Sequence, residues 1–285
     1  MLDNNSYSMS KGTGYLYLDT NILCYVADHP SLWSSLRTLL YKKRLRLAIS
    51  DVHFAELHDA TRKHEKIADL FCFVPACLIN SGENLLRDEI HAYPNTPDDP
   101  LFLSALSSQT HDRSIILTNL RSQQLQDSRS EMRHIANHMH AIIVERMQNF
   151  KPSPTGVYTK KQAPLFVHHA VIQQLMNQAP EFLLRFQDDH SRLSVDSFLS
   201  LRLGPLVAFF KYYLGKRRPI APNDLGDQLH LQYFLYCNLV ITEKDNAEIF
   251  SQAQTIEPFP DTLTIETIDF VRNIESSMGD QLTNG

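Results

Sequence analysis

Hydrophobic and polar positions in the first 80 residues alternate between short apolar runs and helical spacing. Three short runs predict strands, over residues 15–18, 45–49 and 71–79, the last interrupted by Pro75. Leucines at helical spacing predict a helix over residues 31–44. A second helix is predicted from Val52 to about Lys66, with Ser50 and Asp51 at its N-cap. Strands that alternate with helices predict a parallel α/β sheet.

The pattern changes in the middle of the chain. From about residue 84 to residue 215 the strand signal nearly disappears, and the apolar positions take the spacing of amphipathic helices. After Pro219 and Pro222 the first pattern returns, with a helix over 223–237 and strands over 238–242 and 262–266. The predicted fold class is α/β, a three-layer parallel sheet flanked by helices. The predicted domains are residues 14–83 with 217–273 for this sheet, a mostly helical insertion over 84–216 and a disordered tail over 1–13.

Composition narrows the class of protein. The chain has 285 residues, of which 43% are hydrophobic and 21% charged, as in soluble globular proteins. No apolar run approaches the roughly 18–20 residues that a membrane span needs. The N-terminal residues are polar and lack the apolar core of a signal peptide, so we expect a cytoplasmic protein without a membrane partner.

The net charge argues against a broad non-specific nucleic-acid surface, and the cysteine spacing argues against a zinc site. The formal net charge is −5, whereas proteins that depend on non-specific phosphate contacts are often basic, so any nucleic-acid contact must be local. The four cysteines form no CxxC pair, which argues against a zinc site and for buried free thiols.

The stretch GYLYLDTNIL at residues 14–23 contains an apolar run that ends on Asp19, Thr20 and Asn21. In an open parallel sheet, ligands bind beyond the carboxyl ends of the strands. Other acidic residues also follow predicted strands or begin the helices next to them, namely Glu56, Asp227, Glu243 and Asp245. Carboxylates that converge on one edge repel each other, and a hard divalent cation such as Mg²⁺ or Mn²⁺ removes that repulsion.

Three segments carry a family resemblance. YLDTNIL, AISDVHFAEL and DLGDQLHLQYFLYCNLVITEKDN together resemble the PIN domain, a family of metal-dependent ribonucleases with a parallel sheet between helices. The resemblance covers roughly residues 15–80 and 220–270. The helical stretch over 84–215 makes this chain about twice as long as the small toxin-type members.

The resemblance implies roles for individual residues. Asp19, with Asn21 beside it, matches the first acid of the family, Glu56 matches the acid in the second helix, and Asp227 matches the third acid. Thr242 matches the Thr or Ser that follows the strand after that helix. Asn21 and Thr242 are expected to orient the metal ligands or a water molecule.

The fourth acid and the third acid each have an alternative. The family usually places its fourth acid two residues after the Thr, where this chain has Lys244, flanked by Glu243 and Asp245. Either flanking acid could complete the site. Asp224 lies one helical turn before Asp227 and is a second choice for the third acid.

Other charged and aromatic groups favour structural roles. His134 and His138 are four residues apart but lack a Glu between them in an HExxH pattern, so a half-buried helix face is favoured for them, for His140 and for the pair His168 and His169. The aromatic residues over 209–213 are expected to pack in a core. A basic run could hold a phosphate backbone near the site, namely Lys216, Arg217 and Arg218.

The resulting functional hypothesis is a divalent-metal-dependent nuclease that hydrolyses phosphodiester bonds, with single-stranded RNA as the expected substrate. The resemblance implies products with a 5′-phosphate and a 3′-hydroxyl. Three alternatives stay open: a non-catalytic scaffold, a toxin or defence nuclease controlled by a protein partner, and a phosphatase or phosphotransferase with an aspartyl nucleophile at a strand end. The last of these needs an Asp two residues after Asp19, where the chain has Asn21. Self-association and the choice between RNA and DNA are also left open.

Overall fold

The computed structural model describes residues 14–58, 60–96, 112–122, 158–189, 192–214, 222–257 and 259–274, although the side chains over 222–226 are not described. These residues form a three-layer α/β fold around a five-stranded sheet in which every pair of neighbours is parallel. The strand order is β3-β2-β1-β4-β5. The strands are β1 (Gly14–Leu18), β2 (Leu45–Ile49), β3 (Ala76–Leu78), β4 (Leu239–Thr242) and β5 (Thr264–Thr267).

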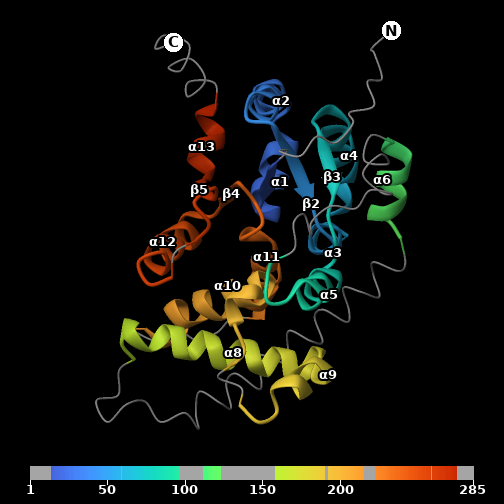
Figure 1. The fold of residues 1–285 in the computed structure, drawn as a ribbon. Helices are drawn as coiled ribbons and strands as arrows, with labels where there is room; N and C mark the ends of the chain where they lie inside the picture. The colour runs from blue at the N-terminus through green and yellow to red at the C-terminus, as the bar shows by residue number, and fades with distance from the viewer. Residues whose placement is uncertain are drawn as a thin grey trace.

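Helices cover both faces of the sheet, as Figure 1 shows. Crossovers from β1 through β2 to β3 build one face, and helix α13 joins them after β5. These helices are α1 (Thr20–Asp28), α2 (Trp33–Lys42), α3 (Asp51–Leu57), α4 (His64–Phe73) and α13 (Ile268–Arg272). The opposite face is covered by α11 (Pro222–Phe234) and α12 (Lys244–Ala253). This division follows from right-handed crossovers that run in opposite directions away from the central strand.

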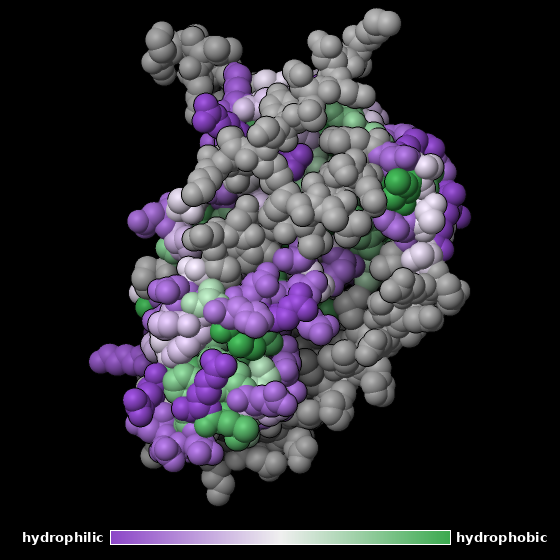
Figure 2. Space-filling model, turned by 45° about the vertical axis from the view of Figure 1, so that its right-hand side comes forward, coloured by the Kyte–Doolittle hydropathy of each residue, from purple (hydrophilic) through white to green (hydrophobic). Residues whose placement is uncertain are grey.

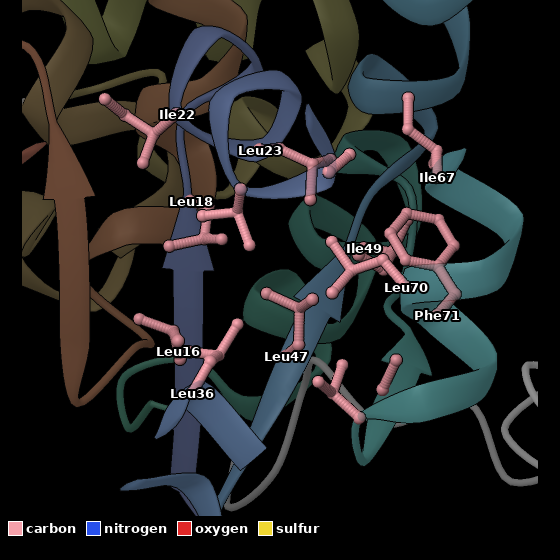
Figure 3. Packing of buried hydrophobic residues seen from close by; sticks show 14 of the residues in the cluster. Leu16, Leu18, Ile22, Leu23, Leu36, Leu47, Ile49, Ile67, Leu70 and Phe71 are labelled. Atoms are coloured by element: carbon pink, nitrogen blue, oxygen red, sulfur yellow. The ribbon is translucent and has the colours of Figure 1, made fainter. Parts of the chain in front are cut away.

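Alternate residues of the central strand supply the two cores. Leu16 and Leu18 of β1 face α1 and α4, where they pack with Leu23, Leu47 and Phe71 (Figure 3). Tyr17 points to the other face and joins the core beneath α11. A strand buried on both faces explains why residues 15–18 read as a continuous apolar run.

The described residues between β3 and β4 are largely helical. Helix α5 (Gly82–Ala92) is followed by α6 (Arg113–Leu120), α8 (Ala163–Gln178), α9 (Pro180–Leu183) and α10 (Leu199–Ala208). Helices α8, α9 and α10 enclose a third core and lie below the sheet in Figure 1. Helix α6 instead packs on α3 and α4, so part of the expected insertion belongs to the first face of the sheet. The predicted domain boundaries remain a prediction.

One buried carboxylate ties these helices to the sheet. Glu89 of α5 is 0% exposed. It accepts hydrogen bonds from the backbone nitrogen of Ser200 at 2.7 Å, from the Ser200 hydroxyl at 2.6 Å and from the Tyr236 hydroxyl. Burial raises the pKa of Glu89, while these hydrogen bonds oppose the rise. Glu89 therefore joins α5, α10 and the segment between α11 and β4.

Two predicted elements differ from the structure. The predicted strand over 71–79 is wrong in its first half, because α4 continues to Phe73 and β3 begins at Ala76. The single helix predicted from Val52 to Lys66 is divided into α3 and α4. The imidazole of His64 donates from Nε2 to the carbonyl oxygen of Leu57 at 2.8 Å, which satisfies a carbonyl at the end of α3.

The described surface is mainly hydrophilic in the view of Figure 2, with smaller hydrophobic areas near the bottom. Exposed large apolar side chains include Leu165 and Met176 of α8 and Leu184 after α9. Among the described residues, no helix is long and apolar enough to span a bilayer. As expected from the sequence, the aromatic side chains of Phe209, Phe210 and Tyr212 are buried.

Candidate functional site

The strand order places a topological switch point, where sheets of this kind form a crevice, at the carboxyl edge between β1 and β4. Successive strands lie on one side of β1 up to β3 and on its other side from β4 onward, so the order reverses between β1 and β4. In open α/β sheets, ligands bind at such a switch point. Asp19 directly follows β1, and its backbone nitrogen donates to the carbonyl oxygen of Ile241 in β4 at 3.0 Å. The end of the first strand therefore lies in the place where this fold offers a ligand site.

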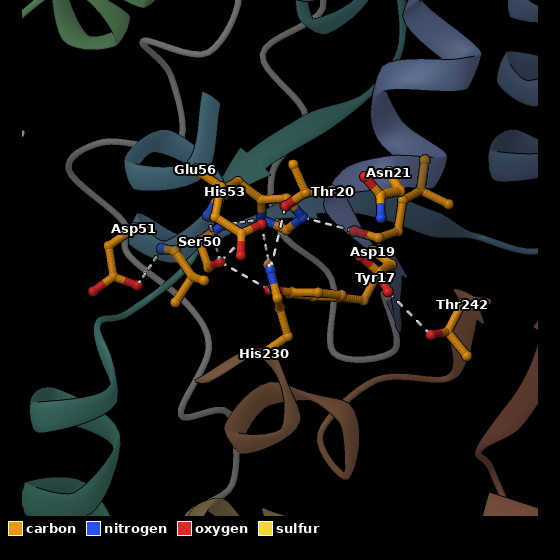
Figure 4. Close-up of polar contacts among 12 residues, drawn as sticks. Tyr17, Asp19, Thr20, Asn21, Ser50, Asp51, His53, Glu56, His230 and Thr242 are labelled. Atoms are coloured by element: carbon orange, nitrogen blue, oxygen red, sulfur yellow. Dashed lines mark hydrogen bonds and ion pairs between the residues drawn. The ribbon is translucent and has the colours of Figure 1, made fainter. Parts of the chain in front are cut away.

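Asp19 is the carboxylate at the centre of this edge (Figure 4). It caps α1 and is 9% exposed. The hydroxyl of Thr242, the last residue of β4, donates to Asp19 Oδ2 at 3.2 Å. Burial raises the pKa of Asp19, and the negative charges of Glu56 and Glu243 raise it further, against the opposing charge of His230. The ionised form of Asp19 is therefore electrostatically unfavourable in the folded protein, and a bound cation would stabilise it.

Glu56 reaches the same edge from α3. Its Oε2 lies 3.0 Å from Nε2 of His230, which comes from α11 and is 2% exposed. Burial would raise the pKa of Glu56, but the hydrogen bond and charge of His230 outweigh it and lower the pKa to about 2. Burial likewise opposes charge on His230, and Glu56, then Asp19, overcome it and raise the pKa. When His230 is protonated, it forms a half-buried ion pair with Glu56.

A series of hydrogen bonds continues behind His230. The Tyr17 hydroxyl lies 2.6 Å from His230 Nδ1 and 2.9 Å from the hydroxyl of Ser50. Ser50 Oγ lies 2.9 Å from Nδ1 of His53, and His53 Nε2 lies 2.7 Å from the carbonyl oxygen of Leu18. The side chains of Tyr17, Ser50 and His53 are all buried. The series therefore runs through the interior from Glu56 to the residue that precedes Asp19.

The local sequence explains why Ser50 and His53 meet. Ser50 is the N-cap of α3, where its hydroxyl accepts from the backbone nitrogen of His53 at 3.4 Å and the ring of His53 accepts from the backbone nitrogen of Ser50 at 3.1 Å. This is a capping box with a histidine in the place of the usual Glu or Gln. Burial lowers the pKa of His53 to about 3, so its ring is neutral.

Asp227 lies one turn before His230 on α11. Its side chain is exposed. Surrounding protein raises the pKa of Asp227 to about 6, and the charge of Asp19 adds to this effect, with Lys211 opposing it. Asp227 is therefore electrostatically coupled to the edge, although water around the exposed carboxylate screens part of that coupling.

The two candidates for the fourth acid have different surroundings. Glu243 accepts a hydrogen bond from Nδ2 of Asn21 at 2.7 Å and contributes to the raised pKa of Asp19. Asp245 lies in the first turn of α12 with an exposed side chain. Of these two acids, Glu243 is the one that a hydrogen bond connects to the edge. The side chain of Asp224 and the basic run Lys216–Arg218 lie outside the described residues.

The described carboxylates at this edge are of the kind that bind divalent cations, but they do not stand close enough together to coordinate one. Burial and the negative charge of neighbouring carboxylates raise the pKa values of Asp19 and Asp227, although the charges of His230 and Lys211 oppose part of this rise. Among the described residues, no three His, Cys, Asp or Glu side chains stand close enough to hold a metal ion as they are. Cation binding thus requires side-chain rotation, for which the exposed Asp227 has room.

Replacement of Tyr17 by Phe tests the buried series directly. The ring would stay, but the nitrogen of His230 and the hydroxyl of Ser50 would lose their common partner in a place without water. We expect Tyr17→Phe to lower the free energy of unfolding by about 1–3 kcal/mol, as for other unsatisfied buried polar groups. Denaturant unfolding at neutral pH measures this change. A loss below about 0.5 kcal/mol would mean that the series is not formed.

Sequence reasoning found the acids but not the groups that hold them. The sequence places Tyr17 in a predicted strand and Ser50 at a predicted helix cap, and neither position indicates a role at the site. A signal was present in the spacing of Ser50 and His53, which is that of a capping box at the start of α3. The partner of Glu56 could not be found locally, because His230 is separated from it by 174 positions.

Comparisons with protein-family models, with curated proteins and with solved structures found no match. The resemblance of the three sequence segments to the PIN domain therefore stays a prediction. The functional argument depends on the position and chemistry of the side chains at the carboxyl edge between β1 and β4.

Proposed function

We propose that this protein is a divalent-metal-dependent nuclease of the PIN type, which hydrolyses phosphodiester bonds, with single-stranded RNA as its substrate. One observation carries the proposal. Asp19, at the carboxyl edge between β1 and β4, is 9% exposed, and burial together with the charges of Glu56 and Glu243 raises its pKa. A buried carboxylate whose neighbours are also carboxylates is typical of a cation site.

The proposed ligands of the cation are Asp19, Glu56 and Asp227, with Glu243 as the fourth acid in preference to Asp245. A bound Mg²⁺ or Mn²⁺ would lower the pKa of an attacking water and stabilise charge on the phosphate. Thr242 donates to Asp19 and Asn21 donates to Glu243, so each fixes the orientation of one carboxylate.

The substrate would be held by local positive charge, since the chain as a whole is acidic. The positive charge of Lys211 lowers the pKa of Asp227 and would likewise attract a phosphate that approaches this acid. The sequence adds Lys216, Arg217 and Arg218, a short distance before α11. A few local contacts of this kind can position a phosphate backbone on an acidic protein.

Cleavage of end-labelled single-stranded RNA tests the proposal. The wild-type protein is compared with Asp227→Asn and with Asp269→Asn, an exposed acid of α13, each with Mn²⁺ and with a chelator. We expect cation-dependent cleavage by the wild type and by Asp269→Asn, with products that carry a 5′-phosphate. Equal cleavage by Asp227→Asn, or cleavage in the chelator, would contradict the proposal.

The affinity for cations should depend on pH. Because the pKa of Asp227 is raised to about 6, the folded protein holds a proton on this carboxylate below that pH, and a cation must displace it. We therefore expect Mn²⁺ affinity to be nearly constant above about pH 7 and to fall up to about tenfold per pH unit below about pH 6. Calorimetric titrations at several pH values measure this. In Asp227→Asn the decline near pH 6 should flatten, and a decline unchanged in that variant would exclude Asp227 as its source.

A non-catalytic scaffold is the second candidate, and it is favoured by the engagement of Glu56 with His230. On that hypothesis the ion pair replaces the cation and the helices between β3 and β4 form the working surface. Absence of both Mn²⁺ binding and RNA cleavage in the wild type would favour it. A toxin or defence nuclease controlled by a partner protein would have the chemistry proposed above, and growth arrest on expression, relieved by Asp19→Asn, would support that role.

A further inference from the structure

The buried series behind Glu56 connects two proposed ligands of the cation. At one end, His230 donates to the carboxylate of Glu56. At the other end, His53 donates to the carbonyl oxygen of Leu18, the residue that immediately precedes Asp19. The series therefore links the side chain of one ligand to the backbone that carries the other, as the side chains in Figure 4 show.

The hydrogens of this series can be assigned from its ends. Nε2 of His53 faces a carbonyl oxygen, so it carries the hydrogen, and Nδ1 is an acceptor. The Ser50 hydroxyl then donates to this Nδ1, and its oxygen accepts from the hydroxyl of Tyr17 and from the backbone nitrogen of His53. This arrangement uses all three bonding positions of the Ser50 hydroxyl.

The direction of donation reverses at His230, whose protonated ring donates from both nitrogens. Since the hydrogen of Tyr17 goes to Ser50, its oxygen accepts from Nδ1 of His230 at 2.6 Å. Nε2 of His230 then donates to Glu56, which keeps the imidazole ring in one orientation. The four side chains behind Glu56 are buried, and each of their hydroxyls and ring nitrogens has a hydrogen-bond partner, so the series is rigid.

We propose that Tyr17, Ser50, His53 and His230 are positioning residues that set the cation affinity of the site by fixing Glu56 relative to Asp19. The proposal depends on the cation-dependent function proposed above. None of the four needs to touch the cation. Groups that hold metal ligands by hydrogen bonds typically change metal affinity by about 10–100-fold when they are removed.

His64 provides a matched control for His53. Both histidines are buried, and both donate from Nε2 to a backbone carbonyl oxygen, at 2.8 Å for His64. His64 lies in α4 outside the series, and its Nδ1 has no hydrogen-bond partner. Replacement of His64 by Leu removes one buried hydrogen bond, whereas replacement of His53 removes its bonds to Leu18 and to Ser50, so His53→Leu should cost more stability than His64→Leu. The effect on the cation should differ.

The experiment measures Mn²⁺ dissociation constants by calorimetry in full-length wild type, His53→Leu, His64→Leu and Tyr17→Phe, with thermal unfolding of each. We expect His53→Leu and Tyr17→Phe to weaken Mn²⁺ binding by about tenfold or more, and His64→Leu to change it by less than about twofold. Tyr17→Phe keeps the aromatic ring, so it stays informative if His53→Leu does not fold. RNA is absent, so the readout does not depend on catalysis.

The outcomes separate this inference from the proposed function. If the wild type binds Mn²⁺ and Asp19→Asn abolishes it, but His53→Leu and Tyr17→Phe bind as His64→Leu does, the positioning role is wrong and the cation site stands. If the wild type binds no Mn²⁺, the cation site itself is wrong and the positioning role falls with it. Equal weakening in His53→Leu and His64→Leu would mean that stability, and not the series, sets the affinity.

Discussion

Asp19→Asn is expected to reduce cation-dependent RNA cleavage by about 10³-fold or more, equivalent to about 4 kcal/mol of activation free energy. The amide can still accept a hydrogen bond from Thr242, so the change removes charge with little change of shape. Removal of the central negative charge weakens the hold on a cation at this edge of the sheet. Initial rates at saturating Mn²⁺ measure the loss.

The same substitution should not destabilise the protein. Burial raises the pKa of Asp19, so the contribution of this carboxyl group to stability is fully present below its usual pKa and is lost as pH rises through the raised pKa, which leaves the ionised form unfavourable at neutral pH. We therefore expect the melting temperature of Asp19→Asn to equal or exceed that of the wild type at neutral pH. Asp28→Asn, at the other end of α1, is the control and should keep full activity. Wild-type cleavage by Asp19→Asn would exclude this carboxylate from the chemistry.

Glu89→Ala is expected to lower the free energy of unfolding by about 3–4 kcal/mol. Its removal leaves the backbone nitrogen of Ser200 and the hydroxyls of Ser200 and Tyr236 without their acceptor in the interior. It also leaves a cavity between α5 and α10. Denaturant unfolding followed by circular dichroism measures the change.

Two variants control this measurement. Glu89→Gln keeps an acceptor oxygen and should cost less than half as much, while Glu83→Ala, on the exposed side of the same helix, should cost less than about 1 kcal/mol. If Glu89→Ala destabilised the protein no more than Glu83→Ala, the buried hydrogen bonds of Glu89 would not hold the helices to the sheet.

The sequence predicted the strands correctly where a short apolar run corresponds to a strand that is buried on both faces of the sheet. Residues 15–18, 45–49 and 238–242 lie in or next to β1, β2 and β4, because short apolar runs between polar residues are typical of strands buried on both faces. The strand predicted over 71–79 is wrong in its first half, because a short apolar run in a buried helix cannot be told from one in a buried strand. Phe71 is buried from α4, and no local feature marks the change to β3 at Ala76.

The candidate site could be predicted only in part. Asp19 was found because an acid at a strand end contrasts with the apolar residues before it. The contacts of Glu56 with His230 and of Tyr17 with Ser50 depend on how α11 lies across the sheet, which no local pattern encodes. The preference for Glu243 over Asp245 likewise depends on Asn21, which meets Glu243 from a distant part of the chain.

The most direct test of the account is a calorimetric titration of the wild type and Asp19→Asn with Mn²⁺ at neutral pH. The account predicts binding by the wild type and at least about 100-fold weaker binding by Asp19→Asn, since a central ligand is lost while the fold is kept. Equal affinity in the two proteins, or no binding by the wild type, would contradict the claim that the carboxyl edge between β1 and β4 is a cation site.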